Sequence, residues 1–139
     1  MKNPEFIMLV DDNDATNYYH HVIIGEAGIE TRVLSFTYAE KALNHFFVDQ
    51  DILLKVFPSG IIFLDINMPG MNGWDFLDEF EKLPVELKAK IVIIVLTTSD
   101  NPLDFEKAGK IPSIKGFMPK PLSEETLKEV INTYLSPTC

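Results

Sequence analysis

Five short apolar runs alternate along the chain with segments of helical periodicity, and this alternation restricts the possible folds more than any other feature. The runs cover residues 6–10, 31–36, 61–64, 91–96 and 114–118. The fourth run, IVIIVL, has no polar residue, which is typical of a strand buried on both faces. Short strands that alternate with helices, beginning with a strand, favour a parallel sheet covered by helices on both faces. We therefore expect an α/β fold.

The segments between these runs indicate five helices. They lie at residues 14–26, at about 37–47, around 74–80, at 103–108 and from 123 to about 135. The first segment has apolar residues at near-helical spacing, namely Ala15, Tyr18, Tyr19, Val22 and Ile23. The segment 103–108 has the weakest pattern and looks poorly capped, and residues 49–59 allow no clear assignment.

Length and charge limit the functions that fit. A chain of 139 residues with 46% hydrophobic and 24% charged residues is typical of one globular domain. A net charge of −9 argues against direct DNA binding and against acidic membranes. No apolar run approaches the roughly 20 residues of a membrane span, and no signal peptide opens the chain. The only cysteine is Cys139, so we expect no internal disulfide and a reducing, cytoplasmic location.

Charged and hydroxyl side chains follow four of the five strands. These residues are Asp11, Asp12, Asp65, Thr97 and Lys120. Parallel strands end at the same edge of a sheet, where functional groups gather. Three carboxylates at one edge raise one another's pKa unless a cation joins them, and Lys120 supplies only one positive charge. A divalent cation with oxygen ligands, such as Mg²⁺, would complete the cluster.

Four motifs carry a family resemblance: LVDDN (9–13), FLDINMPGMNG (63–73), VLTTS (95–99) and FMPKP (117–121). In this order and at these intervals the chain resembles the receiver domain of two-component response regulators, of the single-domain, chemotaxis-regulator-like kind. The resemblance implies a flavodoxin-like (βα)5 three-layer sandwich with a five-stranded parallel sheet of order 2-1-3-4-5. We expect a single receiver domain over residues 1–139 without an output domain, because only residues 136–139 follow the last expected helix.

The resemblance assigns a phosphoacceptor and a metal site. It implies that Asp65 accepts a phosphoryl group from a phosphohistidine. Asp11, Asp12 and Asp65 would hold Mg²⁺ together with the backbone carbonyl of Asn67, with Asp12 as a more direct ligand than Asp11. Mn²⁺ could substitute for Mg²⁺.

Further positions are implied in the same way. Thr97 and Lys120 match residues that contact the phosphoryl oxygens. Thr97 and Phe117 match a pair of residues that move together when the domain switches. We expect Phe117 in the core whether or not it moves. Asn67 and Ser99 match positions that tune the lifetime of the phosphorylated state. The Lys120–Pro121 peptide bond matches one that is cis in the family.

The function implied is a signalling switch rather than an enzyme. Phosphorylation would reorganise the face formed by the fourth helix, fifth strand and fifth helix. The expected partners are a histidine kinase or histidine phosphotransfer protein and a downstream protein target. The chain would be a monomer or a phosphorylation-dependent dimer.

Other functions remain open at this point. A receiver can bind partners without phosphorylation. An aspartate-nucleophile phosphatase of the haloacid dehalogenase type needs a second acid two residues after its nucleophile, where this chain has Asn67. A flavodoxin-like electron carrier is disfavoured because LVDDND would repel the FMN phosphate. Taken singly, Asp11 and Asp12 could cap a helix and Asp65 could be a turn residue. His20, His21 and His45 fit no zinc pattern and are expected at the surface or in packing.

Overall fold

The computed structural model describes residues 4–47, 59–68, 70–98 and 101–134, so most of the unassigned segment 49–59 lies outside the described residues. The strands are β1 (Phe6–Val10), β2 (Arg32–Phe36), β3 (Gly60–Leu64), β4 (Ile91–Thr97) and β5 (Ile114–Pro119). They pair in parallel in the order β2-β1-β3-β4-β5. The sheet and its strand order are therefore confirmed.

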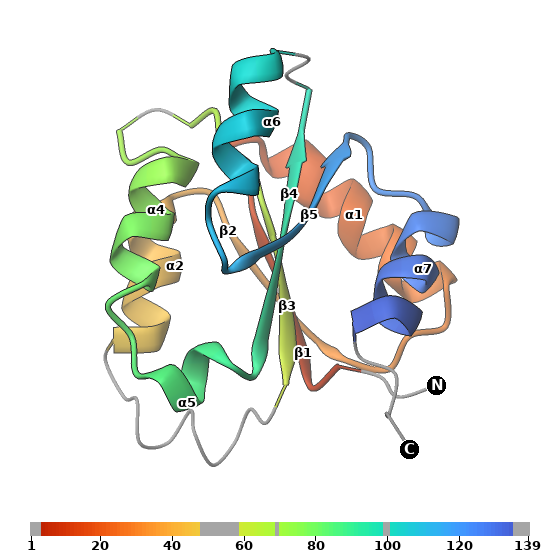
Figure 1. Cartoon of the computed structure of the whole chain (residues 1–139). Coiled ribbons are helices and arrows are strands. Elements are labelled where there is room, and N and C mark those ends of the chain that lie inside the picture. The colour runs from red at the N-terminus through yellow and green to blue at the C-terminus, as the bar shows by residue number, and fades with distance from the viewer. Residues whose placement is uncertain (1–3, 48–58, 69, 99–100, 135–139) are drawn as a thin grey trace.

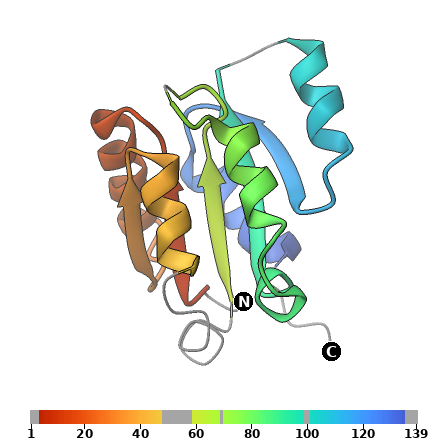
Figure 2. The ribbon, with the colours of Figure 1, turned by 90° about the vertical axis from the view of Figure 1, so that its left-hand side faces the viewer.

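Helices cover both faces of this sheet (Figures 1 and 2). They are α1 (Asp14–Glu26), α2 (Ala39–Phe47), α4 (Gly73–Phe80), α5 (Val85–Lys88), α6 (Pro102–Gly109) and α7 (Glu124–Tyr134). In Figure 1, α1 and α7 lie on one side of the sheet and α2, α4 and α5 on the other. The expected helices are all present. The short helix α5 is an addition that the sequence did not predict.

Two apolar cores hold the layers together. Side chains alternate along β1, so Phe6, Met8 and Val10 join the core shared with α2, α4 and α5. Ile7 and Leu9 point the other way, into the core shared with α1 and α7. Every residue of β1 and β3 is buried, which explains why these strands are apolar throughout rather than alternating.

Helix α1 is confirmed, but most of its apolar residues do not lie on its buried face. Tyr18 is 73% exposed, and Tyr19 and Val22 are also exposed. The buried residues of α1 are Asn17, His20 and Ile24. Asn17 and His20 can be buried because their side chains hydrogen-bond to backbone groups of other segments, and Ile24 joins the apolar core.

Helix α6 is better capped than the sequence indicated. The side chain of Asn101 accepts a hydrogen bond from the backbone N–H of Leu103 at 3.0 Å. Ala108 is the buried residue of this helix, and the Phe105 ring, 64% exposed, packs 5.5 Å from the Phe117 ring of β5. Lys107 Nζ lies 4.5 Å from the centre of the Trp74 ring on α4. Because α6 buries only a small face, its sequence shows only a weak apolar pattern.

None of the described helices is long and apolar enough to cross a membrane.

Gly60 provides a test of the packing between the two central strands. It pairs with Phe6, and a Cβ added at Gly60 would lie 2.0 Å from Cε1 of the Phe6 ring. We therefore expect Gly60→Ala to lower the free energy of unfolding by about 1–3 kcal/mol, the usual cost of overpacking a core. Urea unfolding measures this change. Gly109→Ala is the control, because the added methyl meets nothing within 4 Å, and an equal effect of the two substitutions would contradict the packing argument.

Candidate functional site

Three carboxylates meet where the two central strands end. Asp11 and Asp12 follow β1, and Asp65 follows β3, with the backbone N–H of Asp65 donating to the carbonyl of Val10 at 2.9 Å. One carboxylate oxygen from each of the three aspartates lies within 4.8 Å of the others. Asp11 and Asp65 are buried and Asp12 is exposed. The pairing of β1 with β3 thus brings Asp65 beside the adjacent Asp11 and Asp12, from which it is distant in the sequence.

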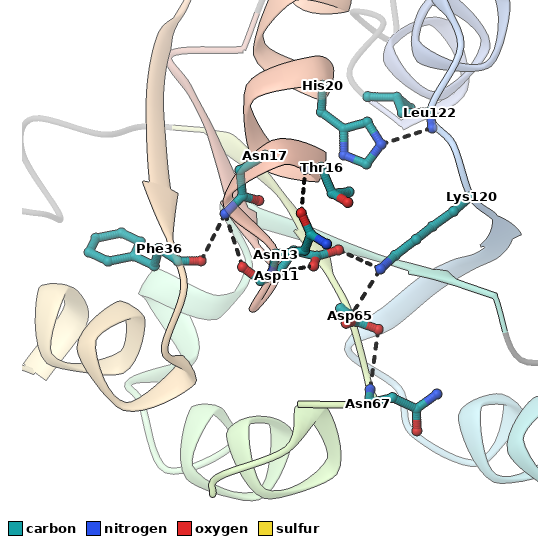
Figure 3. A network of polar contacts seen from close by, with 10 residues as sticks. All are labelled: Asp11, Asn13, Thr16, Asn17, His20, Phe36, Asp65, Asn67, Lys120 and Leu122. Atoms are coloured by element: carbon teal, nitrogen blue, oxygen red, sulfur yellow. Dashed lines mark hydrogen bonds and ion pairs between the residues drawn. The ribbon is translucent and has the colours of Figure 1, made fainter. Parts of the chain in front are cut away.

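Lys120 enters this cluster from the loop after β5 (Figure 3). Its Nζ lies 2.5 Å from Oδ2 of Asp11 and 3.4 Å from Oδ2 of Asp65. Burial alone would lower the pKa of Lys120, but the pairing with Asp11 and Asp65 outweighs it and raises that pKa. Burial raises the pKa of Asp65, against the opposing effects of the Asn67 N–H and the Lys120 ammonium.

Backbone groups of the two loops hold the buried carboxylates. The backbone N–H of Asn13 donates to Oδ1 of Asp11 at 2.9 Å, and that of Asn67 donates to Oδ1 of Asp65 at 3.2 Å. The side chain of Asn13, rather than either aspartate, caps α1 by accepting from the Thr16 N–H at 3.0 Å. Neither Asp11 nor Asp12 caps α1, so both carboxylates remain available to the acidic cluster.

The loop after Asp65 folds back closely against it. The backbone N–H of Gly73 donates to the carbonyl of Ile66 at 3.2 Å. A Cβ at Gly73 would lie 2.6 Å from Cα of Ile66 and 2.7 Å from the Asp65 carbonyl oxygen. A reciprocal capping box between Asn72 and Asp75 then starts α4. The NG pair of the sequence motif therefore fixes the return of the chain next to Asp65.

The other expected site residues lie around this cluster. Thr97 is 1% exposed at the end of β4, and its carbonyl accepts from the Lys120 N–H at 3.0 Å. The Lys120–Pro121 peptide bond is cis. Phe117 is half-buried, so the expectation of a core position was wrong, because β5 is an edge strand with β4 as its only neighbour in the described sheet. Ser99 lies outside the described residues.

Two buried polar side chains of α1 also reach the site, and the sequence reading did not single out either role (Figure 3). Asn17 Nδ2 donates to the carbonyls of Asp11 and Phe36, at 3.0 and 3.3 Å. His20 Nε2 accepts from the backbone N–H of Leu122 at 3.1 Å. Their spacing of three residues places them on one helix face with Ile24, and this spacing was the available signal.

The protonation state of His20 follows from its surroundings. Burial lowers its pKa, the nearby Asp11 carboxylate opposes this effect, and Lys120 adds to it. Because Nε2 accepts a hydrogen bond, the neutral ring carries its proton on Nδ1. His20 is thus a buried, neutral acceptor.

Comparison with known proteins identifies the family. A model of the response regulator receiver domain matches residues 7–132. The chain belongs to the response regulator receiver family. Receiver domains are generally signalling modules rather than enzymes, and membership implies a kinase partner in general terms.

Individual relatives of this receiver agree with the family match. Protein PilH of Pseudomonas aeruginosa is 36% identical over 76 residues, an alignment that covers 55% of this chain and 60% of PilH. The chain thus matches less than two thirds of that relative's length. A two-component response regulator from Cytophaga hutchinsonii is 29% identical with a TM-score of 0.85, covering 98% of this chain and 100% of the other.

Two further solved structures show how widely the fold is shared. A response regulator receiver protein from Dyadobacter fermentans has 25% identity and a TM-score of 0.81, covering 95% of this chain and 98% of the other. The chemotaxis protein CheY4 of Vibrio cholerae has 22% identity and a TM-score of 0.71, covering 94% and 98%, and is similar in fold alone.

The acidic cluster of this receiver could hold a metal ion. Two of its three carboxylates are buried, and the Lys120 ammonium is the cation paired with them among the described residues. Crowded carboxylates with too little positive charge favour a bound cation, and exposed Asp12 leaves one side of the cluster open to solvent. The donor set consists of oxygen atoms, which suits a hard cation.

The burial of His20 predicts a pH dependence of stability. Below pH about 6.5, His20 binds a proton in the unfolded chain but stays neutral in the folded protein. Proton binding therefore favours the unfolded chain, and the free energy of unfolding should fall as pH falls. His45, whose pKa is also lowered by burial and then by Arg32, acts in the same direction. Urea unfolding of the metal-free protein between pH about 7.5 and 5.5 measures this.

His20→Gln should lose part of this decrease, because the titrating group is gone. His21→Gln is the matched control, since His21 lies exposed on the same helix. A His20→Gln protein that keeps the full decrease would show that His20 does not cause it.

Proposed function

We propose that the chain is the phosphoacceptor of a two-component or phosphorelay system, with Asp65 as nucleophile. The observation that carries the proposal is the position of the Asp65 carboxylate, 3.4 Å from the Lys120 ammonium and within 4.8 Å of the Asp11 and Asp12 carboxylates. An oxygen of Asp65 attacks the phosphorus of a phosphohistidine and the P–N bond breaks. The departing imidazole nitrogen keeps the electron pair of that bond, and the proton on the other ring nitrogen makes the leaving histidine neutral. The products are an aspartyl phosphate and a neutral histidine, so no other reactant is needed.

Charge compensation explains why these groups act together. Burial raises the pKa of Asp65 and so disfavours the carboxylate that must attack. Lys120 and a bound cation both favour the ionised form, and they also neutralise the phosphoryl oxygens as these approach. Asp11, Asp12, Asp65 and the Asn67 carbonyl would hold Mg²⁺, with Mn²⁺ as a substitute, and Mg²⁺ would supply charge neutralisation on the transferring group.

The switch we propose runs from Thr97 to the face of α6, β5 and α7. Thr97 and Lys120 would contact the phosphoryl oxygens, and the hydrogen bond between their backbones joins the ends of β4 and β5. Phe117 lies on β5 with its ring against Phe105, which is exposed on α6. A shift of Thr97 toward the phosphoryl group would therefore act on a surface that a downstream protein can reach.

The phosphodonor protein needs a surface beside Asp65. Tyr18, Tyr19 and Val22 form an exposed apolar row on α1, which begins two residues after Asp12. We propose that a histidine kinase or histidine phosphotransfer protein binds there in the cytoplasm, since an exposed apolar row next to an active site favours protein contact. Asn67 and Ser99 remain proposed as residues that tune the lifetime of the aspartyl phosphate.

Phosphorylation tests the function directly. Incubation with acetyl phosphate and Mg²⁺ should add one phosphoryl group per chain, seen as a gain in intact mass. The gain should be absent in Asp65→Asn and without Mg²⁺, and present in the control Asp78→Asn, whose side chain lies exposed on α4. A wild-type protein that gains no mass under any condition would favour a receiver that binds partners without phosphorylation.

Metal binding gives an independent test. A ligand that binds only the folded state stabilises it, by about 2.7 kcal/mol at 100 times its Kd. Mg²⁺ should therefore raise the melting temperature of the protein, and Asp12→Asn should weaken this rise because an accessible carboxylate ligand is lost. Asp14, two residues after Asp12, is also exposed, and Asp14→Asn should show the same rise in melting temperature as the wild type. An undiminished rise in Asp12→Asn would remove Asp12 from the metal site.

A further inference from the structure

A buried histidine ties α1 to the loop that carries Lys120. His20 is 2% exposed, and its Nε2 accepts from the backbone N–H of Leu122, a residue 102 positions away in the sequence (Figure 3). Leu122 is itself 1% exposed. The bond is therefore shielded from water. If the histidine is removed, the Leu122 N–H is left without a hydrogen-bond acceptor.

The three-residue turn from Lys120 to Leu122 is held at both ends. At one end the Lys120 N–H donates to the Thr97 carbonyl at 3.0 Å. At the other end the Leu122 N–H donates to His20 at 3.1 Å. Pro121 between them has no N–H to donate. These two bonds fix the backbone from which the Lys120 side chain extends to Asp11 and Asp65.

Packing on one side of this turn is incomplete. A shallow, solvent-open hollow of about 410 Å³ lies between the turn and α1, with Tyr19, His20, Thr98 and Pro121 in its lining. A turn with free space beside it can shift, so its position depends on hydrogen bonds more than a turn enclosed by side chains would. The His20 bond joins the turn to α1 beside this hollow.

Asn17, one turn earlier on the same helix face, holds the opposite side of the site. Its Nδ2 bonds to the carbonyls of Asp11 and Phe36, at the ends of β1 and β2. Through Asn17 and His20, α1 is joined by hydrogen bonds both to the strand end that carries Asp11 and to the turn that carries Lys120. The separation of the Lys120 ammonium from the Asp11 carboxylate therefore depends on this helix.

We infer that His20 is a positioning residue for phosphorylation: as a neutral acceptor for the Leu122 N–H, it places Lys120 where its ammonium meets Asp65 and the incoming phosphoryl oxygens. The inference rests on the proposed phosphoacceptor function of Asp65. His20 itself touches neither the carboxylates nor the phosphoryl group in this role. Its contribution is the position of the turn, so an acceptor of similar reach should replace it.

Three variants test this role. His20→Leu removes the acceptor, whereas His20→Gln keeps one, since the Gln side-chain carbonyl reaches about as far as Nε2. His21→Leu is the control for a changed histidine on the exposed side of the same helix. The measurements are the rate of phosphorylation by acetyl phosphate with Mg²⁺, and the hydrogen exchange of the Leu122 amide followed by NMR in the unphosphorylated protein.

His20→Leu should phosphorylate about 10- to 100-fold more slowly, the usual loss when a group that orients an active-site residue is removed. Its Leu122 amide should exchange faster than in the wild type. His20→Gln and His21→Leu should stay close to wild type in both measurements. A His20→Leu rate equal to wild type, or a His20→Gln rate as slow as His20→Leu, would overturn the inference.

The exchange measurement separates this inference from the proposed function. If the wild type takes up no phosphoryl group, the function of Asp65 fails, and Leu122 exchange still decides whether His20 holds the turn. If the wild type is phosphorylated and Leu122 exchange is unchanged in His20→Leu, the proposed function stands and the role of His20 is refuted.

Discussion

The pairing of one ammonium with buried carboxylates is the interaction on which the rest of the site depends. Asp11 and Asp65 are taken out of water at the end of the central strands, which is costly for charged groups that lack partners. The Lys120 ammonium compensates both negative charges, with Nζ 2.5 Å from Oδ2 of Asp11 and 3.4 Å from Oδ2 of Asp65. The backbone N–H groups of Asn13 and Asn67 donate further hydrogen bonds to these carboxylates. The strand order makes this possible, because it places β1 and β3 side by side and the loop after β5 within reach.

The polar ends of the strands were predictable because they interrupt long apolar runs. An aspartate directly after IIFL stands out in the sequence, as does the lysine–proline pair after the last strand. The structure brings Asp11, Asp12, Asp65 and Lys120 together as that pattern indicated. The order of the strands came from the family resemblance, since periodicity alone does not specify which strands are neighbours.

Other features could not be predicted, for identifiable physical reasons. The buried face of α1 contains Asn17 and His20. Their spacing indicates a shared helix face, but it does not indicate that this face is buried, because Asn17 and His20 have hydrogen-bond partners 19 and 102 residues away. Helix α5 has four residues, too few to show a helical period. The half exposure of Phe117 depends on β5 lying at the edge of the sheet, which its apolar sequence does not reveal.

The contact of Lys107 with Trp74 has a practical consequence. The sequence contains one tryptophan, and the Lys107 ammonium lies 4.5 Å from the centre of its ring. Indole emission responds to a nearby positive charge, and here that charge belongs to α6 while the ring belongs to α4. The intrinsic fluorescence of the protein is therefore an optical reporter of the position of α6, available without any label.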